Sequence, residues 1–423
     1  MTKNDGSKQT YLMVLPVPAR RLNDHQFAIE SAFADHLRLL RRKLGDLAST
    51  LVVALPQMSD ARYQALKASL ATVDETTDNI HFAAMYSEDL GRLGYFKAFP
   101  GIMRALYKEV RQASVVHAGC SELFRPYEFA SLLMGRALGR KTISVTDIDN
   151  RKSPEMNLKS GRWSKREYLS TILLHRPTKR LQQTVAARTC SLVLLKGAKM
   201  AHDYGKGRPN VKNFLDSAFS AEHIIPFAQL EQKCAALSDP ATPLDLTYFG
   251  RLVGYKGVDH MLRALAHAKT LGLQNFRFHI IGGGEEESAL KALTDTLGLQ
   301  HEVIFHGSVP FGKTLFERLH NCHVLLAAPL SEDTPRSALD ALASGQAIVA
   351  YNTYYYEELK SAGAPVTTVA WPDEKALGQA IAKLARDRNQ LAMRLRDAVT
   401  FAQENTQEIW LDRRVEWTRA LFG

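Results

Sequence analysis

The stretch Phe249-Gly250-Arg251-Leu252-Val253-Gly254-Tyr255-Lys256-Gly257-Val258-Asp259 decides the fold of this chain. An apolar run, Leu246–Phe249, ends where the glycines begin, and apolar residues at helical spacing start at Val258. This pattern predicts a strand, a glycine-bearing loop and a helix, the unit of parallel sheets that are covered by helices. Because ligands of such sheets bind beyond the carboxyl ends of the strands, the loop is also a candidate site.

The same alternation runs along the whole chain, in two series on either side of the polar stretch Gln229–Pro243. With 423 residues, the chain is also too long for one ordinary hydrophobic core. We therefore predict two doubly wound α/β domains, at 1–228 and 244–400, joined by a linker at 229–243. The tail, 401–423, is predicted as a helix that packs on the second domain or crosses back to the first. Strands are predicted at Tyr11–Leu15, Leu51–Leu55, Ile80–Ala84, Ser114–Ala118, Thr142–Val145, Ser191–Leu195, His223–Ile225, Leu246–Phe249, Arg277–Ile281, Val303–Phe305, Val324–Ala328 and Ile348–Tyr351.

Composition narrows the class of protein. The chain is 45% hydrophobic and 23% charged, as globular proteins are, and no apolar run is long enough to span a membrane. The polar N-terminus lacks the features of a secretory signal. The four cysteines lie far apart without a C-x-x-C pair, which disfavours a zinc site or a disulfide framework. We expect a cytoplasmic protein.

The excess of basic residues is local. The segment 151–200 holds twelve Lys or Arg and two acids, so it carries the whole formal excess of +10. Within it, Arg162-Trp163-Ser164-Lys165-Arg166 mixes cations with an aromatic ring, and Lys179-Arg180 follows the apolar Ile172-Leu173-Leu174. This mixture favours peripheral attachment to an anionic membrane surface, on the inner face of the cytoplasmic membrane. A solvated basic face or an anionic soluble acceptor is the alternative, and no motif indicates a nucleic-acid partner.

Two further motifs resemble the first in layout. Ile280-Ile281-Gly282-Gly283-Gly284 predicts a strand that ends in glycines before a helix, although packing alone can require glycine there. In the stretch from Pro329 to Gly345, Thr334 suits the N-cap of a helix and Pro335 its first turn. Glu332 then lies just before the helix and Asp340 inside it, so both carboxylates can reach one pocket. An acid at a helix start is also an ordinary cap.

Taken together, these motifs resemble the family-four retaining glycosyltransferases. The resemblance covers about Leu246–Tyr356 and consists of G-R-x(4)-K-G, I-I-G-x-G, F-x-G-x-V at Phe305–Val309, and E-x(7)-acid followed by A-x-A-S-G. It implies a GT-B fold, in which two Rossmann-like doubly wound domains face each other across a cleft. It also implies metal-independent, retaining transfer of a hexose-type sugar from a nucleotide-diphosphate donor, without a cofactor. The acceptor would be a glycan or a lipid-linked sugar, in the assembly of cell-surface polysaccharide or glycolipid.

The resemblance assigns roles to individual residues. Arg251 and Lys256 would bind the donor diphosphate, Glu332 the hydroxyls of the transferred sugar, and Asp340 those of the ribose. Fixed cations suit that role because a departing nucleoside diphosphate gains negative charge in the transition state. The further donor-binding positions are Gly250, Gly282, Gly283, Val309 beside the base, and the backbone amides of Arg336 and Ser337.

The second half departs from the family pattern at two places. Asp340 stands where the family usually has Glu, and Thr334-Pro335 replaces an aromatic and a glycine. Proline removes one backbone amide from the phosphate cradle.

The first half matches the family in architecture alone. No glycine loop follows the first predicted strand, where Arg20 or Arg21 could approach the diphosphate instead. His117 stands where the family often has a histidine near the sugar and completes the predicted catalytic set with Glu332, Arg251 and Lys256. A satisfied structural histidine is the alternative.

Asp147-Ile148-Asp149 is a D-x-D motif, which binds manganese in the other glycosyltransferase fold. A metal is redundant beside the cations of the second domain, so we predict none. An acceptor contact and a role as a loop or cap stay open for this pair.

Other functions fit parts of the same pattern. A sugar-nucleotide epimerase of GT-B fold would use the same phosphate contacts without an acceptor. A non-catalytic sugar-nucleotide sensor would explain Pro335 and Asp340. A dinucleotide oxidoreductase is disfavoured because no G-x-G-x-x-G opens the first predicted strand and helix.

Overall fold

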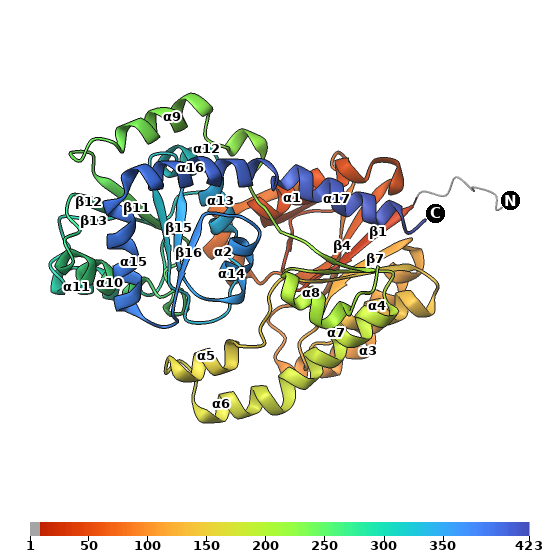
Figure 1. The fold of residues 1–423 in the computed structure, drawn as a ribbon. Helices are drawn as coiled ribbons and strands as arrows, with labels where there is room; N and C mark the ends of the chain where they lie inside the picture. Colours follow the sequence, from red (N-terminus) through yellow and green to blue (C-terminus); the bar gives the residue numbers. More distant parts are fainter. Residues whose placement is uncertain (1–8, 423) are drawn as a thin grey trace. The chain divides into compact units, whose positions relative to one another are not determined.

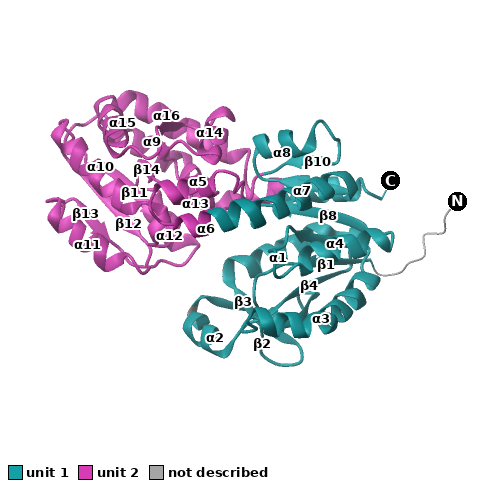
Figure 2. Cartoon of the chain, turned by 90° about the horizontal axis from the view of Figure 1, so that it is seen from below, with its two compact units in different colours: residues 1–147, 169–214, 411–423 teal, residues 148–168, 215–410 magenta. Residues whose placement is uncertain are grey.

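The computed structural model describes residues 9–422, so most of the N-terminus considered for a secretory signal lies outside it. The chain forms two compact units (Figure 2). Unit 1 comprises the residues up to 147, 169–214 and those from 411 onward, and unit 2 comprises 148–168 and 215–410. Each unit is an α/β structure around a parallel sheet (Figure 1), which confirms the predicted fold class.

The sheet of unit 1 has seven parallel strands in the order β10-β9-β8-β7-β1-β4-β6. The strands β1, β7 and β9 are buried along nearly their whole length, which is why they appear in the sequence as continuous apolar runs. A small antiparallel sheet, β2-β3-β5, is added to it. The strands are β1 (Thr10–Val14), β2 (Arg20–Arg21), β3 (Gln26–Glu30), β4 (Thr50–Gln57), β5 (Leu70–Asp74), β6 (Ile80–Ser87), β7 (Val115–Gly119), β8 (Lys141–Thr146), β9 (Leu192–Leu195) and β10 (Val211–Asn213).

Helices of unit 1 connect the parallel strands and bury their apolar faces on the sheet. In α3, for example, Ile102, Leu106 and Val110 are buried at helical spacing. The helical segments are α1 (Ser31–Leu44), η1 (Gly45–Leu47), α2 (Asp60–Leu66), η2 (Lys67–Ser69), α3 (Arg92–Gln112), α4 (Tyr127–Ala137), η3 (Thr171–His175), α7 (Arg176–Thr189), α8 (Ala198–Gly205) and, from Leu411 on, α17 (Gln407–Arg419).

The sheet of unit 2 has six parallel strands in the order β13-β12-β11-β14-β15-β16. The strand order reverses between β11 and β14, and in open α/β sheets such a switch point opens a crevice beyond the carboxyl ends of the strands. The strands are β11 (Leu244–Phe249), β12 (Phe276–Ile281), β13 (Val303–Phe305), β14 (Val324–Ala327), β15 (Ala347–Tyr351) and β16 (Val366–Val369).

The helices of unit 2 cover its sheet on both faces. Both α10 and α15 bury an apolar face at helical spacing. The buried residues include Val258, Met261, Leu262 and Leu265 in α10, and Leu377, Ile381 and Leu384 in α15. The helices are α5 (Ser153–Lys159), α6 (Lys165–Ser170, with its last two residues in unit 1), α9 (Phe227–Ala236), α10 (Val258–Thr270), α11 (Glu287–Thr296), α12 (Lys313–Leu319), α13 (Arg336–Ala343), α14 (Tyr354–Ser361), α15 (Glu374–Arg386) and α16 (Arg388–Gln403).

The boundaries of the units differ from the predicted ones. The predicted linker 229–243 is largely the helix α9, which packs on α16 inside unit 2. Leu230 and Cys234 form the buried face of this amphipathic helix together with Lys233, whose ammonium donates a hydrogen bond of 2.9 Å to the carbonyl of Ser344. The chain passes from unit 1 to unit 2 at 214–215 instead, and the segment 148–168 also belongs to unit 2.

Two local predictions also need correction. The predicted strand His223–Ile225 is wrong: a 3-10 turn, Ala221–His223, takes its place, because Ser220 and His223 form a capping box there. Helix α13 begins at Arg336 with Pro335 at its N-cap, so Thr334 does not cap it. Among the described residues, no helix combines the length and apolarity needed to cross a membrane.

Candidate functional site

Glycines bring the two loops at the carboxyl ends of β11 and β12 into close contact. Gly282 has φ +148°, and a Cβ there would lie 1.9 Å from the carbonyl oxygen of Gly250. Gly257, at the start of α10, has φ +64°, and its Cβ would lie 2.0 Å from the carbonyl oxygen of Ala328. No other residue fits at these positions without moving the backbone. The predicted glycine motifs therefore fix the loops that surround the switch point.

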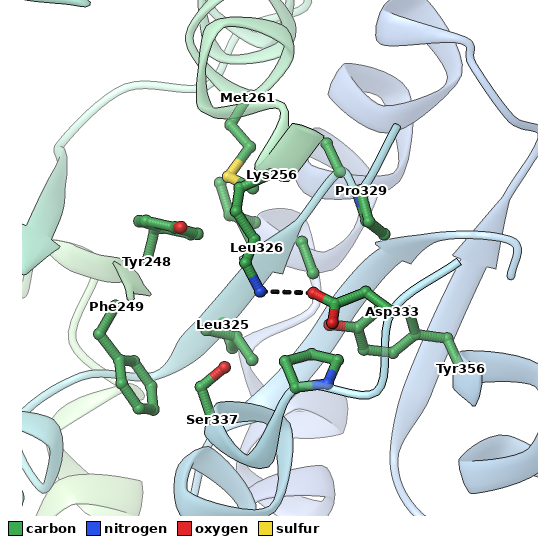
Figure 3. A pocket seen from close by; sticks show the side chains of 13 residues that line it. Tyr248, Phe249, Lys256, Met261, Leu325, Leu326, Pro329, Asp333, Ser337 and Tyr356 are labelled. Carbon is green, nitrogen blue, oxygen red and sulfur yellow. Dashed lines mark hydrogen bonds and ion pairs between the residues drawn. The ribbon is translucent and has the colours of Figure 1, made fainter. Parts of the chain in front are cut away.

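A pocket lies between the ends of β11 and β14 and the start of α13 (Figure 3). Lys256 extends into it, and Ser337 in the first turn of α13 lines it from the opposite side. Helix starts attract anions because their first backbone amides have no partner within the helix. The pocket thus combines a cation with a helix N-terminus.

Lys256 forms an ion pair with Asp333 in this pocket (Figure 3). Both side chains are largely buried, and the second oxygen of the Asp333 carboxylate accepts a hydrogen bond of 3.0 Å from the amide of Thr334. Asp333 is not among the residues predicted from the sequence, although it stands next to Glu332 in the loop before the helix. The lysine predicted to bind phosphate is therefore neutralised by a carboxylate in this structure.

Arg251 and Lys256 both contact the side chain of Tyr255. Its guanidinium donates a hydrogen bond of 3.2 Å to the hydroxyl of Tyr255, and the ammonium of Lys256 is 5.1 Å from the centre of that ring. Tyr248 donates a hydrogen bond of 2.7 Å to the carbonyl of Arg251 and so fixes its backbone. The structure brings the two predicted diphosphate-binding residues together.

Glu332 is 7% exposed, and both its carboxylate oxygens accept hydrogen bonds, of 3.2 and 3.3 Å, from the amide of Tyr354 at the start of α14. Burial raises the pKa of Glu332 to about 7, although that backbone hydrogen bond and the ammonium of Lys152 oppose the rise. Near neutral pH its carboxyl group therefore exchanges between an acceptor and a donor of hydrogen bonds.

The other donor-binding positions predicted in unit 2 lie around the same loops. Asp340, in α13, is 4% exposed. The pKa of Tyr355 is raised mainly by burial, and the charges of Tyr356 and then Asp340 raise it further. Gly283 faces Ser308, and Val309 packs partly buried against one of the two cores of unit 2. The side chain of Arg336 is exposed at the start of α13.

The candidate residues of the first half lie in unit 1. His117 in β7 is 2% exposed, and its Nδ1 lies 2.9 Å from the hydroxyl of Tyr11. Burial holds its pKa well below the usual range, so the ring is neutral. Arg20 is paired with Asp60, and Arg21 with Glu75. These contacts favour structural roles for all three.

The two acids of the D-x-D motif fall in different units. Asp149, in unit 2, receives two hydrogen bonds, of 2.7 and 2.5 Å, from the guanidinium of Arg151, while Asp147 ends the first segment of unit 1. Within residues 9–422, no cluster of three or more His, Cys, Asp or Glu side chains has the arrangement of a metal site.

Comparison with known proteins agrees with this fold. Residues 232–400 match the model of the family described as glycosyl transferases group 1. The comparison with curated proteins found no match.

Solved structures resemble the whole chain at low sequence identity. HepE of Anabaena, solved with UDP and glucose, is 15% identical with a TM-score of 0.63, over 97% of this chain and 99% of that one. Sucrose-phosphate synthase from Thermosynechococcus elongatus is 15% identical with a TM-score of 0.65, over 98% and 99%. WaaG, a glycosyltransferase of lipopolysaccharide biosynthesis, is 13% identical with a TM-score of 0.63, over 96% and 98%. The chain thus has the GT-B fold, and its residues 232–400 match the family of group 1 glycosyl transferases.

Proposed function

We propose that this protein is a retaining, metal-independent glycosyltransferase that moves a hexose-type sugar from a nucleoside-diphosphate donor to a glycan or lipid-linked acceptor. The observation that carries the proposal is the pocket at the switch point of a group 1 domain, where Lys256 and the start of α13 meet. Arg251 lies next to it on Tyr255. Cations and helix amides at one point are what a diphosphate leaving group requires.

In such a transfer, the bond between the anomeric carbon and the diphosphate oxygen breaks. The acceptor oxygen bonds to the same face of the sugar, and the proton of the acceptor hydroxyl passes to the departing phosphate. No protein nucleophile is needed. Arg251 and Lys256 would stabilise the charge that develops on the diphosphate, and Glu332 would accept hydrogen bonds from sugar hydroxyls.

Lys256→Ala tests the proposal most directly. We expect transfer to fall at least about a hundredfold, the usual size for the loss of one charge contact in the transition state. The rate would be measured with a panel of nucleotide sugars, with and without a chelator, beginning with UDP-glucose because HepE has been solved with it. Near-native transfer by Lys256→Ala would refute the assignment.

Asp333 provides the control for this variant. Lys256→Ala leaves the Asp333 carboxylate without its cation beside the donor, so part of the loss could come from that anion. In the double variant Lys256→Ala/Asp333→Asn this anion is absent, and we expect most of the loss in kcat to remain. Incubation of donor alone separates an epimerase from a transferase, and donor binding without turnover on any acceptor would indicate a sensor.

We further propose that unit 1 attaches to an anionic membrane surface. Leu93 and Phe96 in α3 are 82% and 80% exposed, and Leu173 and Leu174 in η3 are also exposed. Phe124 connects the two elements, because the guanidinium of Arg92 lies 4.7 Å from its ring centre and His175 packs against its edge. Exposed apolar side chains among basic residues suit the interface of a bilayer with anionic lipids.

A further inference from the structure

Three cationic side chains of unit 2 gather around one aromatic ring, that of Tyr255. Two of them, Arg251 and Lys256, belong to the predicted donor site. The third is Arg162, whose guanidinium carbon lies 5.3 Å from the centre of the ring. Arg162 lies about ninety residues before Tyr255 in the sequence, in the segment 148–168 that joins unit 2.

Asn157 holds Arg162 in this position. Its side-chain oxygen accepts a hydrogen bond of 2.9 Å from the Arg162 guanidinium, and its backbone carbonyl accepts one of 3.0 Å from the Arg162 amide. The side-chain amide of Asn157 in turn donates a hydrogen bond of 3.4 Å to Ser331, the residue before Glu332. Because Asn157 is buried, this connection ties Arg162 to the loop that carries the predicted sugar-binding carboxylate.

The charges around Tyr255 are not balanced. Among the three cations, Lys256 is paired with Asp333. In the described part of the chain, the side chains of Arg251 and Arg162 donate hydrogen bonds to neutral partners, the hydroxyl of Tyr255 and the side-chain oxygen of Asn157 respectively. One guanidinium, that of Arg162, lies at the Tyr255 ring and the other, that of Arg251, at its hydroxyl. Like charges that share a side chain in this way repel each other, and an anion that binds both relieves the repulsion. The arrangement is therefore suited to a ligand with more than one negative oxygen.

Two features of this chain weaken the phosphate cradle that the family pattern implies. Asp333 neutralises Lys256, and Pro335 removes a backbone amide before the start of α13. A further guanidinium would offset both, since its planar fork of donors matches phosphate oxygens.

We propose that Arg162 is a third cation of the donor site and binds the diphosphate of the nucleotide sugar together with Arg251 and Lys256. This inference rests on the proposed function and adds a residue from outside residues 232–400, the range that matches the family. It also assigns a role to part of the basic segment 151–200, which brings positive charge to the donor as well as to the surface of unit 1.

The test is the affinity of the purified full chain for nucleoside diphosphates, measured by calorimetry with UDP, GDP and ADP. With the diphosphate that the unaltered protein binds most tightly, Arg162→Ala should raise Kd about tenfold, as expected for the loss of a charge-assisted contact with phosphate. Arg162→Lys keeps the charge but lacks the planar fork of donors, so its Kd should lie between those of Arg162→Ala and the unaltered protein. Lys159→Ala is the matched control, because Lys159 is an exposed cation of the same segment, and its Kd should stay within about twofold of that of the unaltered protein.

The corresponding nucleoside without phosphates separates a phosphate contact from a structural effect. Its affinity should be the same for Arg162→Ala and for the unaltered protein. Unchanged diphosphate affinity in Arg162→Ala, or an equal loss for nucleoside and diphosphate, would overturn the role of Arg162 and leave the proposed transferase intact. If the unaltered protein binds none of the three diphosphates, the proposed function fails together with this inference. Melting curves of all variants verify that they are folded, and Arg162→Lys replaces Arg162→Ala if the latter is not.

Discussion

At the scale of single residues, Glu332 is the group whose chemistry depends most on its surroundings. Burial in the loop before α13 raises its pKa to about 7, while its hydrogen bonds with the amide of Tyr354 favour the ionised form. A carboxylate accepts hydrogen bonds from sugar hydroxyls at both oxygens, whereas the protonated acid loses part of that capacity. The ionised fraction of Glu332 should therefore govern donor binding near neutral pH.

We expect the rate of transfer at low donor concentration to fall as the pH is lowered through about 7, and to approach a tenfold loss per pH unit at lower pH. The direction follows from the raised pKa, since the acid is protonated below that value and ionised above it. Glu332→Gln should be slow and should lack this dependence between about pH 5.5 and about pH 8. A profile for Glu332→Gln that parallels that of the unaltered protein would assign the titration to another group.

At the scale of elements, the entry into α10 depends on a contact between backbones. Gly257 precedes the helix with a positive φ, and the carbonyl of Ala328 occupies the place where a side chain would begin. Gly298, after α11, has nearly the same φ of +65° but no atom within 4 Å of its Cβ position. Replacing Gly298 with alanine therefore measures the free-energy cost of the backbone conformation alone, whereas replacing Gly257 adds the cost of the contact with Ala328.

Gly298→Ala should lower the free energy of unfolding by about 1 kcal/mol, the cost of a left-handed conformation for alanine. Gly257→Ala should lower it by about 3 kcal/mol or more, because the strand end at Ala328 must also move. Urea unfolding measures both, and calorimetry should show weaker donor binding for Gly257→Ala alone. Equal losses of stability would mean that the loop adjusts without cost.

Elements were predicted unevenly from the sequence. Long buried strands, such as β4 and β11, can be predicted from their apolar runs. The glycine loops can be predicted because glycine is the residue that adopts a positive φ most readily. The strands β2, β3 and β5 were missed because they form a small antiparallel sheet without a long apolar run. Helix α9 was taken for a linker because its outer face is polar.

At the scale of the whole molecule, the basic segment 151–200 does not act as one surface. Residues up to 168 join unit 2, where Arg151, Lys152 and Arg162 lie near the donor loops. The residues from 169 on join unit 1, where Leu173 and Leu174 are exposed beside the basic start of α7. We therefore expect unit 1 alone to attach to a membrane.

Flotation with liposomes of anionic lipid tests this attachment. The protein should float at low salt and much less at high salt, since about 1 kcal/mol per basic residue near the surface is screened. Replacing Leu93 and Phe96 with Ser should reduce flotation severalfold, because both apolar side chains are largely exposed. Met393→Ser, at an exposed position of α16 in unit 2, is the control and should float like the unaltered protein. If the unaltered protein does not float at low salt, the proposed attachment to an anionic membrane is wrong.

The sequence by itself determined the parallel sheets, the glycine loops and the place of Arg251, Lys256 and Glu332 at strand ends. These features are local, since apolar runs and glycines act on the chain within a few residues. The tertiary structure alone decided that Asp333 neutralises Lys256, 77 residues away, and that the segment 148–168 brings Arg162 to Tyr255. Such pairs depend on how distant segments pack, and no periodicity or spacing in the sequence records that.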